Sequence, residues 1–106
     1  MDIFNHFSCH MKLPVLLQHV VDHILDTTAV NRIEIYKVDI DPKKLQGFCI
    51  VYDDKPHNSI NHQRVAWIGV SKHLSPEEQR LVICKELIHV QDREAETAGT
   101  AEQVAT

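Results

Sequence analysis

One stretch, from Ser75 to Asp92, constrains the fold most because it carries both the start signal and the apolar spacing of a long helix. Ser75 suits the N-cap, Pro76 suits the first helical position, and Glu78 completes a capping box. At 3.6 residues per turn, the apolar and polar residues fall on opposite sides. The apolar arc contains Leu81, Ile83, Cys84, Leu87, Ile88 and Val90, and the polar stripe contains Glu78, Lys85, Glu86, His89, Asp92 and Arg93. We therefore expect a mostly buried helix with one polar stripe.

The segments before this helix change from a helical to a strand period. Apolar spacing predicts a helix over residues 13–26, and alternation of polar and apolar residues predicts a strand over 32–38. Two apolar strands follow at 47–52 and 65–70, joined by a polar loop, so we expect them to pair antiparallel. The expected fold class is α+β, with a small three-stranded antiparallel sheet and the helices packed on one of its faces.

The end of the chain is acidic and rich in alanine. Gly99 is expected to end one helical segment, and Thr100 with Gln103 is a weaker capping box for the next. That next helix would have barely two turns before Thr106, too few to be stable alone. We expect either that the natural domain continues or that a partner covers this end.

Size and composition place the chain among small globular domains. Its 106 residues predict one domain, 1–106, or one that stops early. The net charge is −4 and no stretch is rich in Lys or Arg, so we expect no nucleic-acid partner. Three cysteines without C-x-x-C spacing suggest reduced thiols. No signal peptide and no apolar stretch of membrane-spanning length is evident, so we expect a cytoplasmic protein without a membrane partner.

The polar stripe contains a pattern close to that of zinc peptidases. Lys85-Glu86-Leu87-Ile88-His89 differs from H-E-x-x-H at its first position. In H-E-x-x-H, the two histidines ligate zinc and the glutamate is the general base. Glu86 and His89 stand at the positions of the base and the second ligand, whereas Lys85 replaces the first ligand.

The order of these segments resembles a known family. A glycine-led strand at 47–52, a strand at 65–70 and the lead-in Pro76-Glu77-Glu78-Gln79-Arg80 precede the E-x-x-H pattern. Together they are similar to the ImmA/IrrE family of bacterial and phage-encoded zinc metallopeptidase-like domains. The similarity covers residues 33–106 and is specific in 75–89. It implies a zincin-like minimal core, a link to phage and mobile-element regulation, and a third zinc ligand comparable to Glu102 in Glu102-Gln103-Val104-Ala105.

Lys85 puts the metal of that family in doubt. A catalytic zinc needs three protein ligands, and a protonated lysine repels the ion. His89 and Glu102 alone would bind zinc weakly, so the expected cofactor is none, or zinc if a third ligand is supplied by His57, His62 or His73. Alternatively, the Lys85 amine fills the cation site and pairs with Glu86 or Glu102. His19 and His23 also lie one turn apart, but nothing nearby completes a metal site.

Four interpretations remain open at this point. The plainest is that Lys85 and Glu86 lie on an ordinary solvated helix face. The favoured functional one is a degenerate metallopeptidase-like domain, without catalysis, that binds a peptide or protein as a regulatory module. A second functional interpretation is an active zinc peptidase that cleaves a regulatory protein, with Glu86 as its base. A third functional interpretation is a small structural or assembly protein that forms homo-oligomers through its terminal helix.

Overall fold

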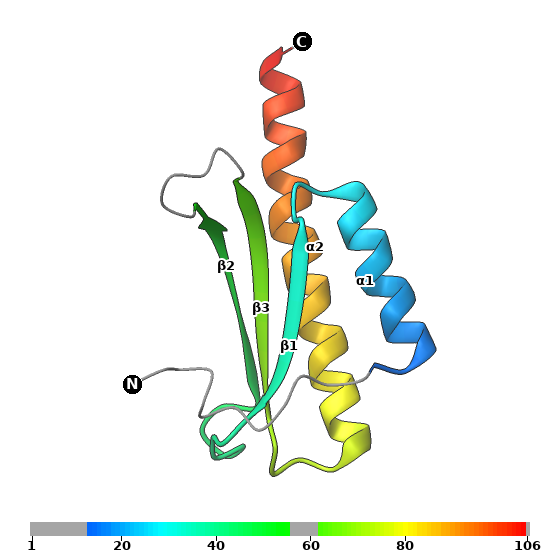
Figure 1. Ribbon diagram of the computed structural model, residues 1–106, viewed down its shortest axis with the longest axis vertical. Coiled ribbons are helices and arrows are strands. Elements are labelled where there is room, and N and C mark those ends of the chain that lie inside the picture. The colour runs from blue at the N-terminus through cyan, green and yellow to red at the C-terminus, as the bar shows by residue number, and fades with distance from the viewer. Residues whose placement is uncertain (1–12, 56–61, 106) are drawn as a thin grey trace.

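The computed structural model describes residues 13–55 and 62–105, and for residues 96–105 it describes the backbone alone. Within these residues five elements follow one another along the chain (Figure 1). They are helix α1 (Val15–Thr27), strand β1 (Arg32–Val38), strand β2 (Gly47–Asp54), strand β3 (Gln63–Ser71) and helix α2 (Pro76–Ala105). The α+β class is confirmed, as are the positions of α1, of the three strands and of the start of α2 to within a few residues.

The sheet is mixed, so the expectation of three antiparallel strands is wrong. The strand order is β1-β3-β2. β2 pairs antiparallel with β3, as expected, but β1 pairs with β3 in parallel, with Ile35 opposite Ile68. The burial of β3 accounts for the strand order, because its residues 65–71 are all buried in the structure. A strand buried on both faces takes the centre of a sheet, and β3 therefore separates β1 from β2.

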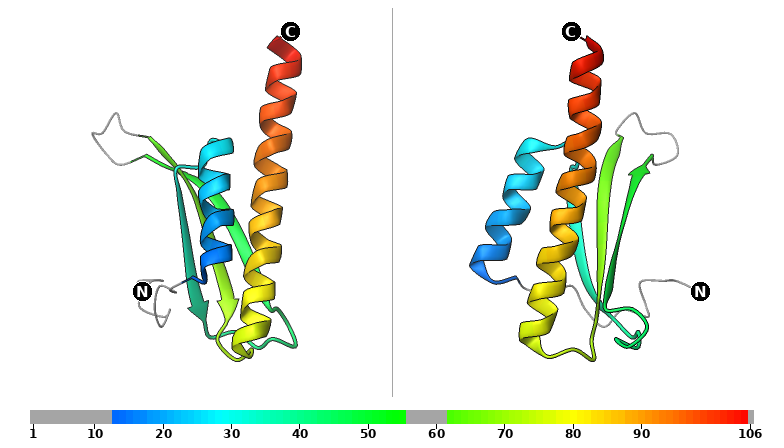
Figure 2. Two further views of the ribbon diagram at one scale, coloured as in Figure 1. Left: turned by 90° about the vertical axis from the view of Figure 1, so that its right-hand side faces the viewer. Right: turned by 180° about the vertical axis from the view of Figure 1, so that it is seen from behind.

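Both helices cover the same face of the sheet, as expected from the sequence (Figure 2). The core between the two layers contains Ile24 of α1, Ile35 of β1, Ile68 of β3, and Ile83 and Leu87 of α2. Four of these five side chains are fully buried, and Ile35 is nearly so. The molecule is therefore a two-layer sandwich with one apolar core.

Helix α2 begins as the sequence predicts. The Ser75 backbone N–H donates to Glu78 Oε1 at 3.2 Å, and the Glu78 N–H donates to Ser75 Oγ at 3.2 Å. This reciprocal pair is a capping box. The hydrogen bonds from Ser75 also lower the pKa of the Glu78 carboxyl below its ordinary value.

Two other expectations about α2 are wrong. The apolar arc is narrower than expected, because Ile83, Leu87 and Val90 are fully buried whereas Leu81 is 72% and Ile88 48% exposed. The sheet covers only one side of the helix, and those two side chains point away from it. The helix also continues through Gly99 to Ala105. A glycine in a helix interior costs only about 1 kcal/mol relative to alanine, which is compatible with a continuous helix.

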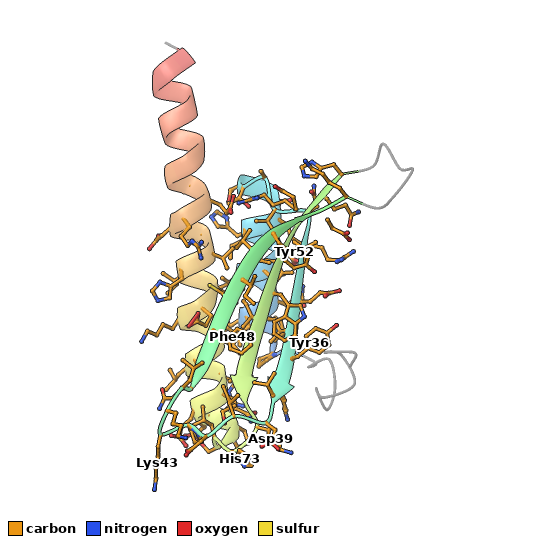
Figure 3. All side chains as sticks on the ribbon, turned by 90° about the vertical axis from the view of Figure 1, so that its left-hand side faces the viewer. Tyr36, Asp39, Lys43, Phe48, Tyr52 and His73 are labelled. Atoms are coloured by element: carbon orange, nitrogen blue, oxygen red, sulfur yellow. The ribbon has the colours of Figure 1, made fainter. Side chains whose placement is uncertain are left out.

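The opposite face of the sheet carries aromatic side chains. The Trp67 ring stacks on Tyr36 and on Phe48, with centroid distances of 5.2 and 5.5 Å. Figure 3 shows Tyr36, Phe48 and Tyr52 on the face turned away from the helices. Phe48 lies over Gly69, where a β-carbon would come within 2.6 Å of the ring. The strands are thus packed on both faces, which holds the edge strand β2 in a fixed position beside α2.

Candidate functional site

The polar stripe of α2 lies beside the first residues of β2, and a pocket of about 240 Å³ opens where the two meet. Lys85 and Glu86 line it from α2, Gly47 lines it from β2, and Lys44 and Leu45 line it from the loop between β1 and β2. Two residues of the Lys85-Glu86-Leu87-Ile88-His89 pattern therefore border a cavity. Lys85 is exposed and Glu86 is half-buried, so an ordinary solvated helix face is also compatible with this placement.

Gly47 allows the strand and the helix to approach each other closely. A β-carbon at this position would overlap Val82 Cγ1 of α2 and would lie 3.0 Å from the carbonyl oxygen of Gly69. Glu86 Cγ would be 3.8 Å away. The glycine that begins β2 is thus required for the packing of β2 against the motif.

Glu86 faces β2 as well as the pocket. Burial raises the pKa of the Cys49 thiol, and the negative charge and hydrogen bonding of Glu86 raise it further, while Arg93 opposes them. A thiol with a raised pKa stays protonated at neutral pH and is a poor nucleophile or metal ligand. Cys49, Glu86 and Arg93 therefore form a polar contact between β2 and α2, with no sign of an activated cysteine.

Lys85 and His89 are both exposed, one turn apart on α2. Lys85 forms no ion pair with Glu86, so the expected pairing of the two is not present. Lys85 is among the residues that line the pocket. His89 is not among the pocket residues.

Glu102 lies on the same continuous helix as His89. Thirteen residues separate the two, which places Glu102 about 20 Å further along the helix axis. Its side chain is outside the described part of the structure. A zinc site that takes His89 and Glu102 from one chain does not fit this helix, because the two residues are too far apart along the helix axis to ligate one ion.

The other histidines considered as zinc ligands lie elsewhere. His73 Nε2 is 2.6 Å from Asp39 Oδ1, at the end of the sheet where β1 and β3 finish (Figure 3). His62 Nε2 is 3.0 Å from Asp53 Oδ1, and His57 lies outside the described residues. Within residues 13–55 and 62–95 no three His, Cys, Asp or Glu side chains converge on one point. The donors present there do not match a tetrahedral zinc site.

An ion pair that we did not predict fixes the middle of α2. The Glu94 side chain, only 6% exposed, accepts hydrogen bonds from Arg64 Nε and Nη2 at 2.9 to 3.1 Å. Arg64 Nη1 also donates to Asp53 Oδ1 at 3.0 Å. The sequence did contain a signal, because Glu94 continues the buried row of Ile83, Leu87 and Val90 at helical spacing. This contact anchors α2 to β3.

Comparison with known proteins gives no relative: no family model matches the chain, and neither a curated protein nor a solved structure does. Among the described residues, no helix has both the length and the apolar character needed to cross a membrane. The functional argument therefore depends on the residues and their geometry.

Proposed function

We propose that this chain is a non-catalytic domain of the metallopeptidase-like type, which binds an extended peptide or partner segment along β2 as a regulatory module. The observation that carries the proposal is the pocket lined by Lys85 and Glu86 at the start of an edge strand. Within the described residues β2 pairs only with β3. Its other edge therefore offers backbone donors and acceptors to an added strand.

The side chains beside this edge support binding more than catalysis. A peptidase would need a metal-bound water next to Glu86, yet an amine takes the position of the first ligand, and Glu102 is far along the helix. An extended peptide needs only the strand edge and side-chain pockets next to it. The strand edge of β2 and the neighbouring pocket supply both.

The test uses a pool of random heptapeptides tethered to beads through either end. Peptides retained by the protein would be synthesised and titrated into ¹⁵N-labelled protein. We expect shifts of the amide signals of residues 47–54 and of 82–89. The proposal is overturned if no peptide is retained, or if the shifts fall only on the aromatic face or on α1.

The same peptides decide between binding and cleavage. Each would be incubated with the protein and added zinc, and the products analysed by mass spectrometry. We expect intact peptide. Zinc-dependent cleavage that disappears in Glu86→Gln would establish the active peptidase instead.

A further inference from the structure

We infer that the pocket at the start of β2 binds the C-terminal carboxylate of the extended peptide. This inference rests on the proposed binding along β2 and adds to it both a direction and a chemical class of ligand. It follows from the polarity of β2, the position of the pocket and the charges around it.

The polarity of β2 determines which end of the peptide reaches the pocket. An added strand that continues the antiparallel pairing of β2 with β3 would run opposite to β2. Its C-terminal end would then lie beside Gly47, where β2 begins. Antiparallel pairing is also slightly more stable per residue than parallel pairing. Lys44 and Leu45 line the pocket just beyond this point, which favours a peptide that ends there.

The charges at the pocket favour an anion. Lys44 lines it from the loop and Lys85 lines it from α2, and neither forms an ion pair within the described residues. Glu86 is the one acidic residue of the lining, and it also interacts with Cys49 of β2. Two cations and one anion leave a net positive charge, and a terminal carboxylate can accept hydrogen bonds from both amines.

The position of the pocket favours the end of the peptide over one of its side chains. An antiparallel strand added beside β2 would end next to Gly47, and Lys44 and Leu45 line the pocket just beyond that point. We therefore assign the pocket to the peptide terminus.

The experiment compares three forms of one heptapeptide taken from the retained pool. The first has a free C-terminal acid, the second is its amide, and the third is the amide with aspartate as the last residue. Affinities are measured by fluorescence anisotropy with an N-terminal dye. We expect the free acid to bind at least about tenfold more tightly than either amide, which corresponds to one charge-assisted contact.

Variants test the two lysines. Lys44→Gln and Lys85→Gln should each weaken binding of the free acid by about two- to fivefold, as expected for exposed charge pairs, and leave the amide unchanged. Glu86→Gln should strengthen binding of the free acid, because it removes the negative charge from the pocket. Lys43→Gln is the matched control, because Lys43 is exposed next to Lys44 without lining the pocket. It should bind the acid as the wild type does.

The outcomes separate this inference from the proposed function. If acid and amide bind equally and both shift the amide signals of β2, the carboxylate assignment is wrong while binding along β2 stands. If the aspartate amide binds as tightly as the acid, the pocket accepts a side chain, and the terminal assignment is again wrong. If no form shifts β2, the proposed function itself fails.

Discussion

At the scale of single residues, the side chain at position 85 determines which chemistry this part of α2 can support. Histidine and lysine are both compatible with an exposed position on α2. An imidazole would form a one-turn pair with His89, whereas lysine contributes a long cationic side chain to the lining of the pocket. The same position can therefore serve metal binding or anion binding, according to its side chain.

A histidine placed at position 85 tests this interpretation. Lys85→His would place two imidazoles one turn apart, so we expect zinc affinity to rise by about tenfold or more over the wild type. Isothermal titration with zinc measures it. Lys85→Gln is the control, because it removes the positive charge without adding a donor. If Lys85→His binds no more zinc than this control, the idea of a degenerate metal site is wrong.

The Glu94 carboxylate is expected to be among the most important polar groups for stability. Glu94→Ala would remove all three hydrogen bonds from Arg64 and leave a partly buried guanidinium with Asp53 as its remaining partner. We expect a loss of about 2–3 kcal/mol in the free energy of unfolding, below the full value for a buried pair because Arg64 is partly exposed. Urea denaturation measures it. Asp92→Ala, an exposed acidic residue on the same helix, should change the value by less than about 0.5 kcal/mol.

Asp53 is expected to make stability depend on pH in the acid range. Hydrogen bonds from Arg64 and His62 hold the pKa of the Asp53 carboxyl below its ordinary value of 3.8. The unfolded chain therefore takes up this proton more readily, so the contribution of Asp53 is present above that value and is lost as the pH falls below it. Asp53→Asn should lower stability at pH 7 and flatten the decrease between roughly pH 5 and pH 2.

The measurement for Asp53 is the free energy of unfolding as a function of pH. Asp39 and Glu78 also have lowered pKa values, so part of the slope should remain in the variant. Asp92→Asn is the control, because its carboxylate has no hydrogen bond or ion pair within the described residues. An unchanged slope in Asp53→Asn would contradict the link to Arg64.

At the scale of elements, neighbouring apolar residues of α2 have very different surroundings. Leu87 is fully buried against the sheet, whereas Ile88 is 48% exposed on the far side. We expect Leu87→Ala to cost about 2–5 kcal/mol and Ile88→Ala less than about 1 kcal/mol. Urea denaturation of the two variants checks this. Similar losses in both would show that the wide apolar arc expected from the sequence is the correct one.

The elements themselves could be predicted from the sequence because their signals are local. The capping box of Ser75 and Glu78, the alternation in β1 and the apolar run in β3 each depend on residues close in the chain. The strand order could not be predicted in the same way. Alternation in β1 is equally compatible with either neighbour, since it reports which residues face the core and not which strand lies beside them.

The site was predicted in part for the same reason. Lys85 and Glu86 were found from a local pattern, and both do border a pocket. The rest of that pocket comes from residues about forty positions earlier, and the role of Lys44 has no signal in the sequence. Cys49 likewise meets Glu86 only because β2 becomes the edge strand beside α2.

At the scale of the whole molecule, α2 is much longer than the layer it packs on. Figure 1 shows its last turns extending past the sheet and past α1. Glu94, bound to Arg64, is the last buried residue of α2 among those whose side chains the structure describes. After Ala95 the helix continues for ten more residues, which span about 15 Å. The sandwich and its pocket are therefore complete before this extension begins.

A chain that ends after Ala95 tests whether the extension matters to the fold or to assembly. A helical segment of this length contributes little stability alone, so we expect the free energy of unfolding to fall by less than about 1 kcal/mol. Circular dichroism should show reduced helix content. Light scattering should show that the number of subunits per particle is the same as in the full chain. A fall from dimer to monomer would instead support the assembly protein among the alternatives, because the extension would then be its interface. A loss of several kcal/mol without a change in assembly would mean that the extension packs on its own sandwich, contrary to the structure.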